Sequence, residues 1–177
     1  MLSNLMQKRP ALRHGLAAAI GAALTVLALD QLSKYLVVVA MDLRNVGVID
    51  VFPGLSFRMA WNTGVNFGVL SGGGDATRWI LGIGTSIIAL ALIAGSLRCK
   101  RMLRAIGLGI AAGGAIGNAI DRLNWGAVAD FLNVSCCGID NPWSLNVADI
   151  AIFAGFGLLL LPLGEKSAPQ SPAAPPA

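Results

Sequence analysis

The chain has 177 residues, of which 55% are hydrophobic and only 12% are charged, and its formal net charge is +4. An ordinary soluble domain carries about 25% charged residues, and a chain of this length cannot bury so much apolar surface in one core. The composition therefore excludes an ordinary soluble protein and predicts an all-α integral membrane protein with one compact domain.

Four apolar stretches follow one another along the chain, each close to the ~20 residues that cross a bilayer core. They lie at residues 15–36, 79–97, 105–120 and 147–164, which predicts a four-transmembrane-helix bundle. The first stretch follows Lys8, Arg9 and Arg13, as in a signal peptide, but no small-residue cleavage site comes after it. We therefore expect a retained helix in a single membrane-embedded domain over residues 1–166, followed by a disordered Pro/Ala-rich tail at 167–177.

The basic residues are distributed unevenly over the segments that join these stretches. The N-terminal tail, the connection at 98–104 and the C-terminal tail hold eight of the 13 basic residues but only one of the nine acidic residues. Short basic loops stay in the cytoplasm. We therefore predict two cytoplasmic termini, and we place the acid-rich segments 40–75 and 123–145 on the outer side of the membrane.

Three short segments outside the apolar stretches have the character of strands. Val48–Phe52 and residues 55–61 flank the turn residues Pro53-Gly54. In the second of these segments apolar and polar residues alternate, which is the period-two pattern of a half-buried strand. Residues 128–132 are also strand-like. The sequence thus predicts a small periplasmic β-sheet platform at the membrane surface.

The third apolar stretch is rich in small residues and ends in polar ones. It carries Gly109, Gly113, Gly114 and Gly117, and small residues at such spacing let helices approach closely in lipid. We interpret all four as helix-packing residues. At the outer end of the stretch, Asn118, Asp121 and Arg122 share one helix face, and the amide of Asn118 needs hydrogen-bond partners there.

Asp30, Asp121, Asp130 and Asp149 lie at the edges of apolar segments, and the predicted topology brings all four to one face of the membrane. Carboxylates beside hydrocarbon are costly, so they indicate a functional site. Asp130 and Asp149 flank a polar loop that can return the chain to the same place. Two carboxylates in a poorly solvated site titrate as a coupled pair, which is how an aspartic protease activates water. The sequence leaves open which of them is protonated.

Simpler interpretations stay open for some of these residues. Asp30 and Lys34 are spaced i,i+4, so they can serve only to neutralise each other. Asp149 lies three residues after Asn146, and helix capping alone can explain it. A small membrane transporter or proton channel is the alternative function, because such proteins also carry intramembrane carboxylates. That alternative predicts polar groups through the whole depth of the bilayer, and the stretch at 79–97 has no charged residue.

Five segments of the chain, in this order, resemble the motifs of the lipoprotein signal peptidase (signal peptidase II) family of bacterial inner-membrane proteins. They are Asp30-Gln-Leu-Ser-Lys34, Asn62-Thr-Gly-Val-Asn-Phe-Gly68, Gly113-Gly-Ala-Ile-Gly-Asn-Ala-Ile-Asp-Arg122, Val128-Ala-Asp-Phe131 and Asn146-Val-Ala-Asp149. Each motif is weak alone, but together and in the family's order they are specific. The chain departs from the family pattern at Val65-Asn66, where small residues are usual, and at Leu145, where Phe commonly precedes the Asn.

The resemblance implies a membrane aspartic endopeptidase whose catalytic residues are Asp130 and Asp149. Such an enzyme removes signal peptides from bacterial prolipoproteins by cutting before a diacylglyceryl-modified cysteine. The substrate-binding and supporting residues would be Asp30, Lys34, Asn62, Gly64, Asn118, Asp121, Arg122, Asn146 and Ala148. Its partners would be diacylglyceryl prolipoproteins and membrane lipid. It would be a monomer in the bacterial inner membrane, with the active site at the periplasmic face.

No group of residues in the chain is typical of a metal site. The one histidine, His14, lies in the basic N-terminal tail, and the three cysteines lack ligand spacing. We therefore expect no metal, no cofactor and no nucleic-acid partner. Cys136 and Cys137 are neighbours in an outer loop, and the sequence leaves their redox state open.

Overall fold

The computed structural model describes residues 2–64, 75–135 and 140–162. In chain order the elements are α1 (Leu2–Lys34), the π-helix η1 (Tyr35–Ala40), α2 (Leu43–Val46), β1 (Val48–Phe52), β2 (Leu55–Asn62), α3 (Asp75–Ser96), α4 (Met102–Trp125), β3 (Val128–Val134) and α5 (Val147–Leu160). The motif residues 65–68, the pair Cys136 and Cys137 and the tail 167–177 lie outside the described residues.

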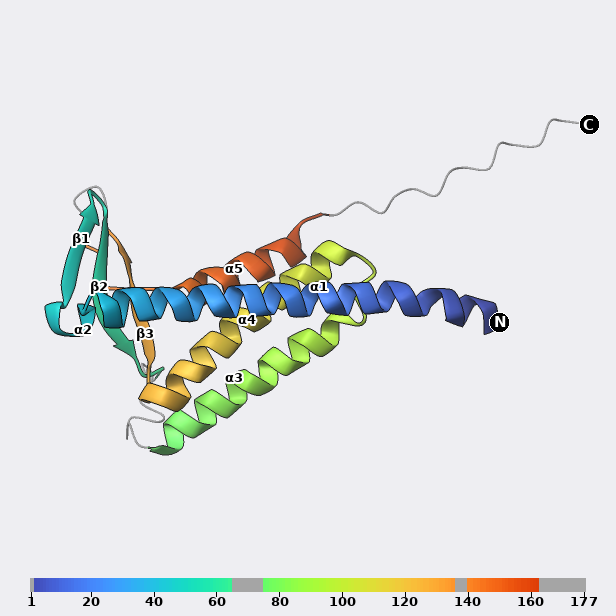
Figure 1. The fold of residues 1–177 in the computed structure, drawn as a ribbon, viewed down its shortest axis with the longest axis horizontal. Coiled ribbons are helices and arrows are strands. Elements are labelled where there is room, and N and C mark those ends of the chain that lie inside the picture. The colour runs from blue at the N-terminus through green and yellow to red at the C-terminus, as the bar shows by residue number, and fades with distance from the viewer. Residues whose placement is uncertain (1, 65–74, 136–139, 163–177) are drawn as a thin grey trace, which may run out of the picture.

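The long helices run alongside one another, and the sheet lies at one end of the bundle (Figure 1). α1 and α4 run toward the sheet, whereas α3 and α5 run away from it. α4 packs against each of the other three helices. This arrangement brings the end of α1, the end of α4 and the start of α5 together beside the sheet, and these are the places where the sequence has its carboxylates.

Three of the described helical segments are long and apolar enough to cross a membrane. They are His14–Ala40, Asp75–Ser96 and Met102–Trp125. α5 is also apolar but has 14 residues, or about 21 Å at ~1.5 Å per residue, which is shorter than the ~30 Å hydrocarbon core. Of the four predicted spans, the described residues therefore contain three of full length and one short helix.

The glycines of α4 make room for its neighbours. A Cβ added to Gly109 or Gly113 would lie less than 3.0 Å from the α1 backbone, at Ala19 and Ala23 respectively, and one on Gly114 would overlap Ala148 of α5. The packing interpretation holds for these three. It is incomplete for Gly117, where an added Cβ would overlap the carboxylate of Asp30. This glycine lets a polar side chain, and not only a helix, reach α4.

The predicted strands form an antiparallel sheet in the order β1-β2-β3. The strand-like residues 128–132 lie within β3, which is two residues longer and pairs with β2, so that Asp130 lies opposite Ala60. The predicted alternation along β2 holds at Phe57, whose ring meets that of Phe131 edge-on at 5.9 Å. It fails at Trp61, which is 37% exposed because it lies at the rim of the sheet.

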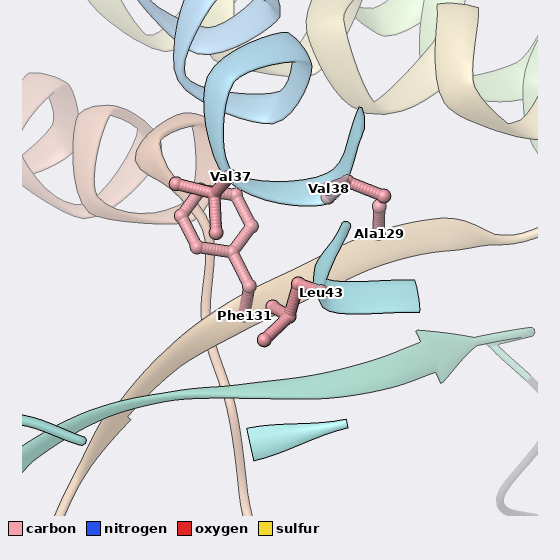
Figure 2. Close-up of a cluster of buried hydrophobic side chains, with 5 residues drawn as sticks. All are labelled: Val37, Val38, Leu43, Ala129 and Phe131. Atoms are coloured by element: carbon pink, nitrogen blue, oxygen red, sulfur yellow. The ribbon is translucent and has the colours of Figure 1, made fainter. Parts of the chain in front are cut away.

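A small apolar cluster fastens the sheet to the extension of α1. Its buried members are Val37, Val38, Leu43, Ala129 and Phe131 (Figure 2). Val37 and Val38 belong to η1 and pack on Ala129 and Phe131 of β3. Since successive side chains of a strand point to opposite faces, Asp130, between the two, points away from this cluster. The packing on one face of β3 thus fixes a carboxylate on the other.

Candidate active site

The first turn of α5 carries Asp149 and is closed by a capping box. Asn146 Oδ1 accepts the backbone N–H of Asp149 at 2.8 Å, and Asp149 Oδ2 accepts the backbone N–H of Asn146 at 3.3 Å. The capping interpretation of Asp149 is therefore correct, and a carboxylate in this place also interacts favourably with the helix dipole. The capping box occupies only Oδ2 of this carboxylate, because Asp149 Oδ1 accepts a hydrogen bond from Asn118 Nδ2 at 2.9 Å.

Asp130 projects from β3 and is only 3% exposed. Its Oδ1 accepts a hydrogen bond from Asn146 Nδ2 at 2.7 Å. Burial, and after it the charge of Asp149, raises the pKa of Asp130 from 3.8 to about 6, although hydrogen bonds from Asn62 and Asn146 act in the opposite direction. Asp130 therefore keeps a proton to a higher pH than an ordinary surface aspartate does.

Two asparagines link the two carboxylates. Asn146 Oδ1 already accepts the backbone N–H of Asp149, so Nδ2 of the same side chain is the donor to Asp130. Asn146 Nδ2 also donates to Asn118 Oδ1 at 3.1 Å, which leaves Asn118 Nδ2 as the donor to Asp149. The orientation of both amides thus follows from the backbone of α5. Each carboxylate receives an amide N–H on one oxygen.

A buried group of charges lies between α1 and α4. Lys34 Nζ is 2.7 Å from Asp30 Oδ2 and 2.6 Å from Asp121 Oδ2, and none of the three side chains is more than 1% exposed. Asp30 and Lys34 therefore do more than neutralise each other, because a carboxylate from a second helix shares the lysine. Gln31 Nε2 approaches the same two carboxylates, at 3.1 Å from Asp30 Oδ2 and 3.3 Å from Asp121 Oδ1.

The other predicted site residues lie at the same end of the bundle. Asn62 Oδ1 accepts the backbone N–H of Gly64 at 3.0 Å, and Gly64 has a φ of +75°, a region that favours glycine. A Cβ on Gly64 would lie 3.7 Å from Arg122 Nη2. Arg122 Nη1 is 3.4 Å from the carbonyl oxygen of Asn118, which accepts its hydrogen bond, and its buried Nε has no partner among the described residues. The Ala148 backbone N–H donates to Asp30 Oδ1 at 3.0 Å.

Asp130 and Asp149 open into one cavity of about 480 Å³. Its other lining residues come from the end of β2 and from the segment before α5: Ala60, Trp61, Asn62, Thr63, Pro142, Trp143, Ser144 and Leu145. Another cavity, of about 390 Å³, lies at the β1–β2 turn and contains none of the predicted site residues. The polar floor and aromatic rim of the larger cavity suit an extended peptide with apolar side chains.

Sequence reasoning missed three residues that the structure brings to this region. Gln31 touches two carboxylates, and Trp61 and Trp143 line the cavity with exposed fractions of 37% and 66%. The proximity of the two tryptophans to the motif residues Asn62 and Asn146 was the available signal. Within the described residues no three His, Cys, Asp or Glu side chains gather as a metal-binding group, and the expected independence of a metal stays a prediction.

Comparisons with known proteins connect this geometry to an activity. The model of the signal peptidase (SPase) II family matches residues 22–163. Two similar curated proteins are lipoprotein signal peptidases, from Rhodopseudomonas palustris (39% identical; 78% of this chain and 87% of the relative) and Rhizorhabdus wittichii (40%; 86% and 89%). A bacterial membrane enzyme solved at 1.9 Å by the in meso method is 28% identical, with a TM-score of 0.69 over 85% of this chain and 95% of that one. A second such structure, at 2.3 Å, gives 29% and 0.66 over 83% and 87%.

Proposed function

Because the chain belongs to the signal peptidase II family and removes signal peptides from prolipoproteins, we propose that it works as an aspartic endopeptidase with Asp130 and Asp149 as catalytic residues. The observation that carries this proposal is the amide link between them: Asn146 donates to Asp130 and forms the capping box with Asp149. Both carboxylates also line one cavity. Paired carboxylates in such a site share a proton, as aspartic proteases require.

The surroundings of the two carboxylates differ, and we assign their roles accordingly. Asp149 lies in the first turn of α5, at the positive end of the helix dipole, and accepts N–H donors on both oxygens. Asp130 is buried, and its pKa is raised to about 6. A substrate that covers the cavity excludes more water and raises the pKa of Asp130 further. Asp149 is thus the general base and Asp130 the general acid.

The proposed reaction proceeds in two balanced steps. Asp149 takes a proton from water while the water oxygen bonds to the carbonyl carbon of the scissile peptide, and Asp130 gives its proton to the carbonyl oxygen. The product of this step is a neutral gem-diol. One hydroxyl proton of the diol then returns to Asp130, the C–N bond breaks with its electron pair on nitrogen, and Asp149 protonates that nitrogen. Both side chains recover their starting states.

We further propose that the cut precedes a diacylglyceryl-modified cysteine and that the monomeric protein crosses the bacterial inner membrane four times. Both termini are then cytoplasmic and the site is periplasmic. The basic connection between α3 and α4 lies at the opposite end of the bundle from the sheet (Figure 1), in keeping with the positive-inside rule. A lipid-anchored substrate moves in the plane of the bilayer, so its scissile bond reaches this end of the bundle without leaving the membrane.

The alternative function, a small transporter or proton channel, lacks support. The buried polar residues Asp30, Lys34, Asn118 and Asp121 all lie in the last turns of α1 and α4, at the sheet end. Among the described residues, α3 has no charged side chain after Arg78. A conducting path needs polar groups across the whole bilayer, and the buried charged residues that the structure describes in α1 and α4 lie at one end.

The test of the aspartic mechanism is cleavage of a synthetic diacylglyceryl-cysteine signal peptide by the purified protein. Asp130→Asn and Asp149→Asn should each lower kcat by at least ~100- to 10,000-fold, the usual contribution of general acid–base catalysis. The double variant should be little worse than either single one, because the two residues act as a unit. Binding of the lipidated peptide should persist in all three.

The matched control is Asp50→Asn on β1, since Asp50 is exposed and lines only the smaller cavity. This variant should cleave like the wild type. Substantial turnover by Asp130→Asn or by Asp149→Asn would contradict the aspartic mechanism. Inhibition by a chelator that zinc reverses would contradict it as well.

A further inference from the structure

Lys34 lies at the centre of a bridge of side chains that joins the backbone amides of the residues directly before the two candidate catalytic residues. One end of the bridge is Asp30, whose Oδ2 meets Lys34 while its Oδ1 accepts the backbone N–H of Ala148 at 3.0 Å. The other end is Asp121, whose Oδ2 meets Lys34 and accepts the backbone N–H of Ala129 at 3.2 Å. Ala148 immediately precedes Asp149 and Ala129 immediately precedes Asp130. Each half of the bridge therefore ends at the backbone N–H of the residue directly before a candidate catalytic aspartate.

The bridge joins four different elements of the fold. Asp30 and Lys34 belong to α1, Asp121 to α4, and the two alanines to α5 and β3. The Ala148 N–H lies in the first turn of α5, where backbone N–H groups have no partner inside the helix, so the bridge supplies one from another helix. Consecutive Cα atoms are ~3.8 Å apart, and each anchored amide therefore fixes the Cα of the neighbouring aspartate closely.

The surroundings leave the bridge little freedom to move. All three charged side chains are at most 1% exposed. Gly117 lies against the Asp30 carboxylate so closely that a Cβ there would overlap it. Burying three charges costs more than their attraction returns unless the geometry is complete, and here a one-to-two ratio of lysine to carboxylate is completed by two backbone N–H donors. Apolar side chains would fill this space at lower cost but would not hold either amide.

We propose that Asp30, Lys34 and Asp121 are positioning residues that set the separation of the Asp130 and Asp149 carboxylates. This inference rests on the proposed aspartic mechanism. None of the three lines the cavity, so none touches the substrate there. Loss of Lys34 leaves Asp30 and Asp121 facing each other without their common cation, and their repulsion moves α1 and α4, and with them both anchored amides, apart. The catalytic step then suffers while the substrate still binds.

The decisive variant is Lys34→Met, which keeps an unbranched side chain only one atom shorter and removes its charge. We expect kcat to fall by about 100-fold or more, since a displacement near 1 Å can cost that much, with KM within about threefold of the wild-type value. The two apparent pKa values in the pH–rate profile of the residual activity should lie closer together than in the wild type, because carboxylates farther apart interact less. A role in folding alone would move neither the ratio of kcat to KM nor that spacing.

Ala89→Gly serves as the control for stability. Ala89 packs with Ala112 and Ala115 between α3 and α4, away from the bridge, and glycine there lowers the helix propensity. It should lower the thermal midpoint but leave kcat and the pH profile as in the wild type. Asp30→Asn keeps an oxygen for the Ala148 N–H but presents an NH2 group to Lys34 in place of Oδ2. Asp121 still contacts the lysine in this variant, so we expect a kcat between those of Lys34→Met and the wild type. If Lys34→Met does not fold, the kcat and pH profile of Asp30→Asn decide alone.

The outcomes separate the two proposals. In one outcome Asp130→Asn is inactive, but Lys34→Met has the same kcat and pH profile as the control Ala89→Gly. The positioning role is then overturned and the aspartic mechanism stands. If Lys34→Met does not fold, Asp30→Asn takes its place in this comparison. If Asp130→Asn cleaves normally, the mechanism itself is wrong, and the positioning role falls with it. A lower kcat with unchanged KM and a narrower pH profile supports the positioning role.

Discussion

Asp130 occupies a place where one strand serves two purposes. Its neighbours Ala129 and Phe131 are almost fully buried in the apolar cluster with η1, and the alternation of the strand turns Asp130 to the other face. The same packing that attaches the sheet to α1 thereby withdraws the carboxylate from water and raises its pKa to about 6. Burial of this carboxylate lowers the stability of the folded protein and keeps Asp130 protonated to a higher pH.

The burial of Asp130 makes the stability of the folded protein depend on pH. Since the pKa of Asp130 is raised in the folded state, the folded protein binds more protons than the unfolded one between about pH 4 and pH 6. Its stability therefore falls as the pH rises through this window, by about 3 kcal/mol at most. Asp130→Asn stays neutral at every pH, so it should unfold at a higher temperature than the wild type at pH 8 and at nearly the same temperature at pH 4.

Thermal unfolding in detergent, followed by tryptophan fluorescence at the two pH values, measures this effect. Asp50→Asn is the control, because Asp50 is exposed and its replacement should change the midpoint little at either pH. If the thermal midpoint of Asp130→Asn exceeded that of the wild type as much at pH 4 as at pH 8, the charge of the buried Asp130 carboxylate would not be the cause.

The sequence revealed contacts between residues close in the chain and the common end of the four carboxylates, but it missed the individual contacts between side chains of different helices. The spacing of Asp30 and Lys34 and the cap at Asn146 follow from helix geometry alone, and the structure contains both. The third partner of Lys34, Asp121, comes from another helix, and helical periodicity says nothing about which helices are neighbours. For the same reason the contact of Gln31 with Asp121 had no signal in the sequence.

At the scale of elements, α4 organises the bundle through its glycines, which have no side chain and so allow neighbouring helices to approach closely. Gly109 and Gly113 allow the backbone of α1 to approach, and Gly114 does the same for α5. In a membrane, where lipid competes equally for apolar surface, such close contact is a main source of helix association. The spacing of these glycines was readable in the sequence, but the partner on each side of α4 was not.

Gly109→Ala should therefore destabilise the protein far more than the same change at an open glycine. A methyl group at Gly109 would overlap the backbone of Ala19 in α1, and overpacking of this kind costs about 1–3 kcal/mol. Gly84 of α3 has no atom within 4 Å of an added Cβ, so Gly84→Ala should be neutral or slightly stabilising through its helix propensity. Thermal midpoints of the two variants in the same detergent test this, and equal midpoints would contradict the close contact of α1 and α4.

The molecule as a whole has two ends of different chemistry. The sheet end carries the buried carboxylates and the cavity, and the other end carries the basic connection between α3 and α4 (Figure 1). Composition and charge alone predicted this polarity, because a membrane constrains sequence strongly. The predicted span 147–164 runs past the end of the last helix: α5 ends at Leu160 with 14 residues, because Pro162 disfavours the helical conformation of the preceding Leu161.

The orientation of these two ends is tested by reporter fusions at three places. A reporter after Lys100 should be cytoplasmic and one after Asn141 periplasmic, since the first lies in the basic connection and the second on the side of the cavity. A third, after Glu165, decides whether the short α5 crosses the bilayer. Local thinning of the bilayer costs only fractions of a kcal/mol per Å, so a helix of about 21 Å can still carry the chain across. We therefore expect the Glu165 fusion to report the same side as the Lys100 fusion; agreement with the Asn141 fusion instead would leave three spans and place the C-terminus outside.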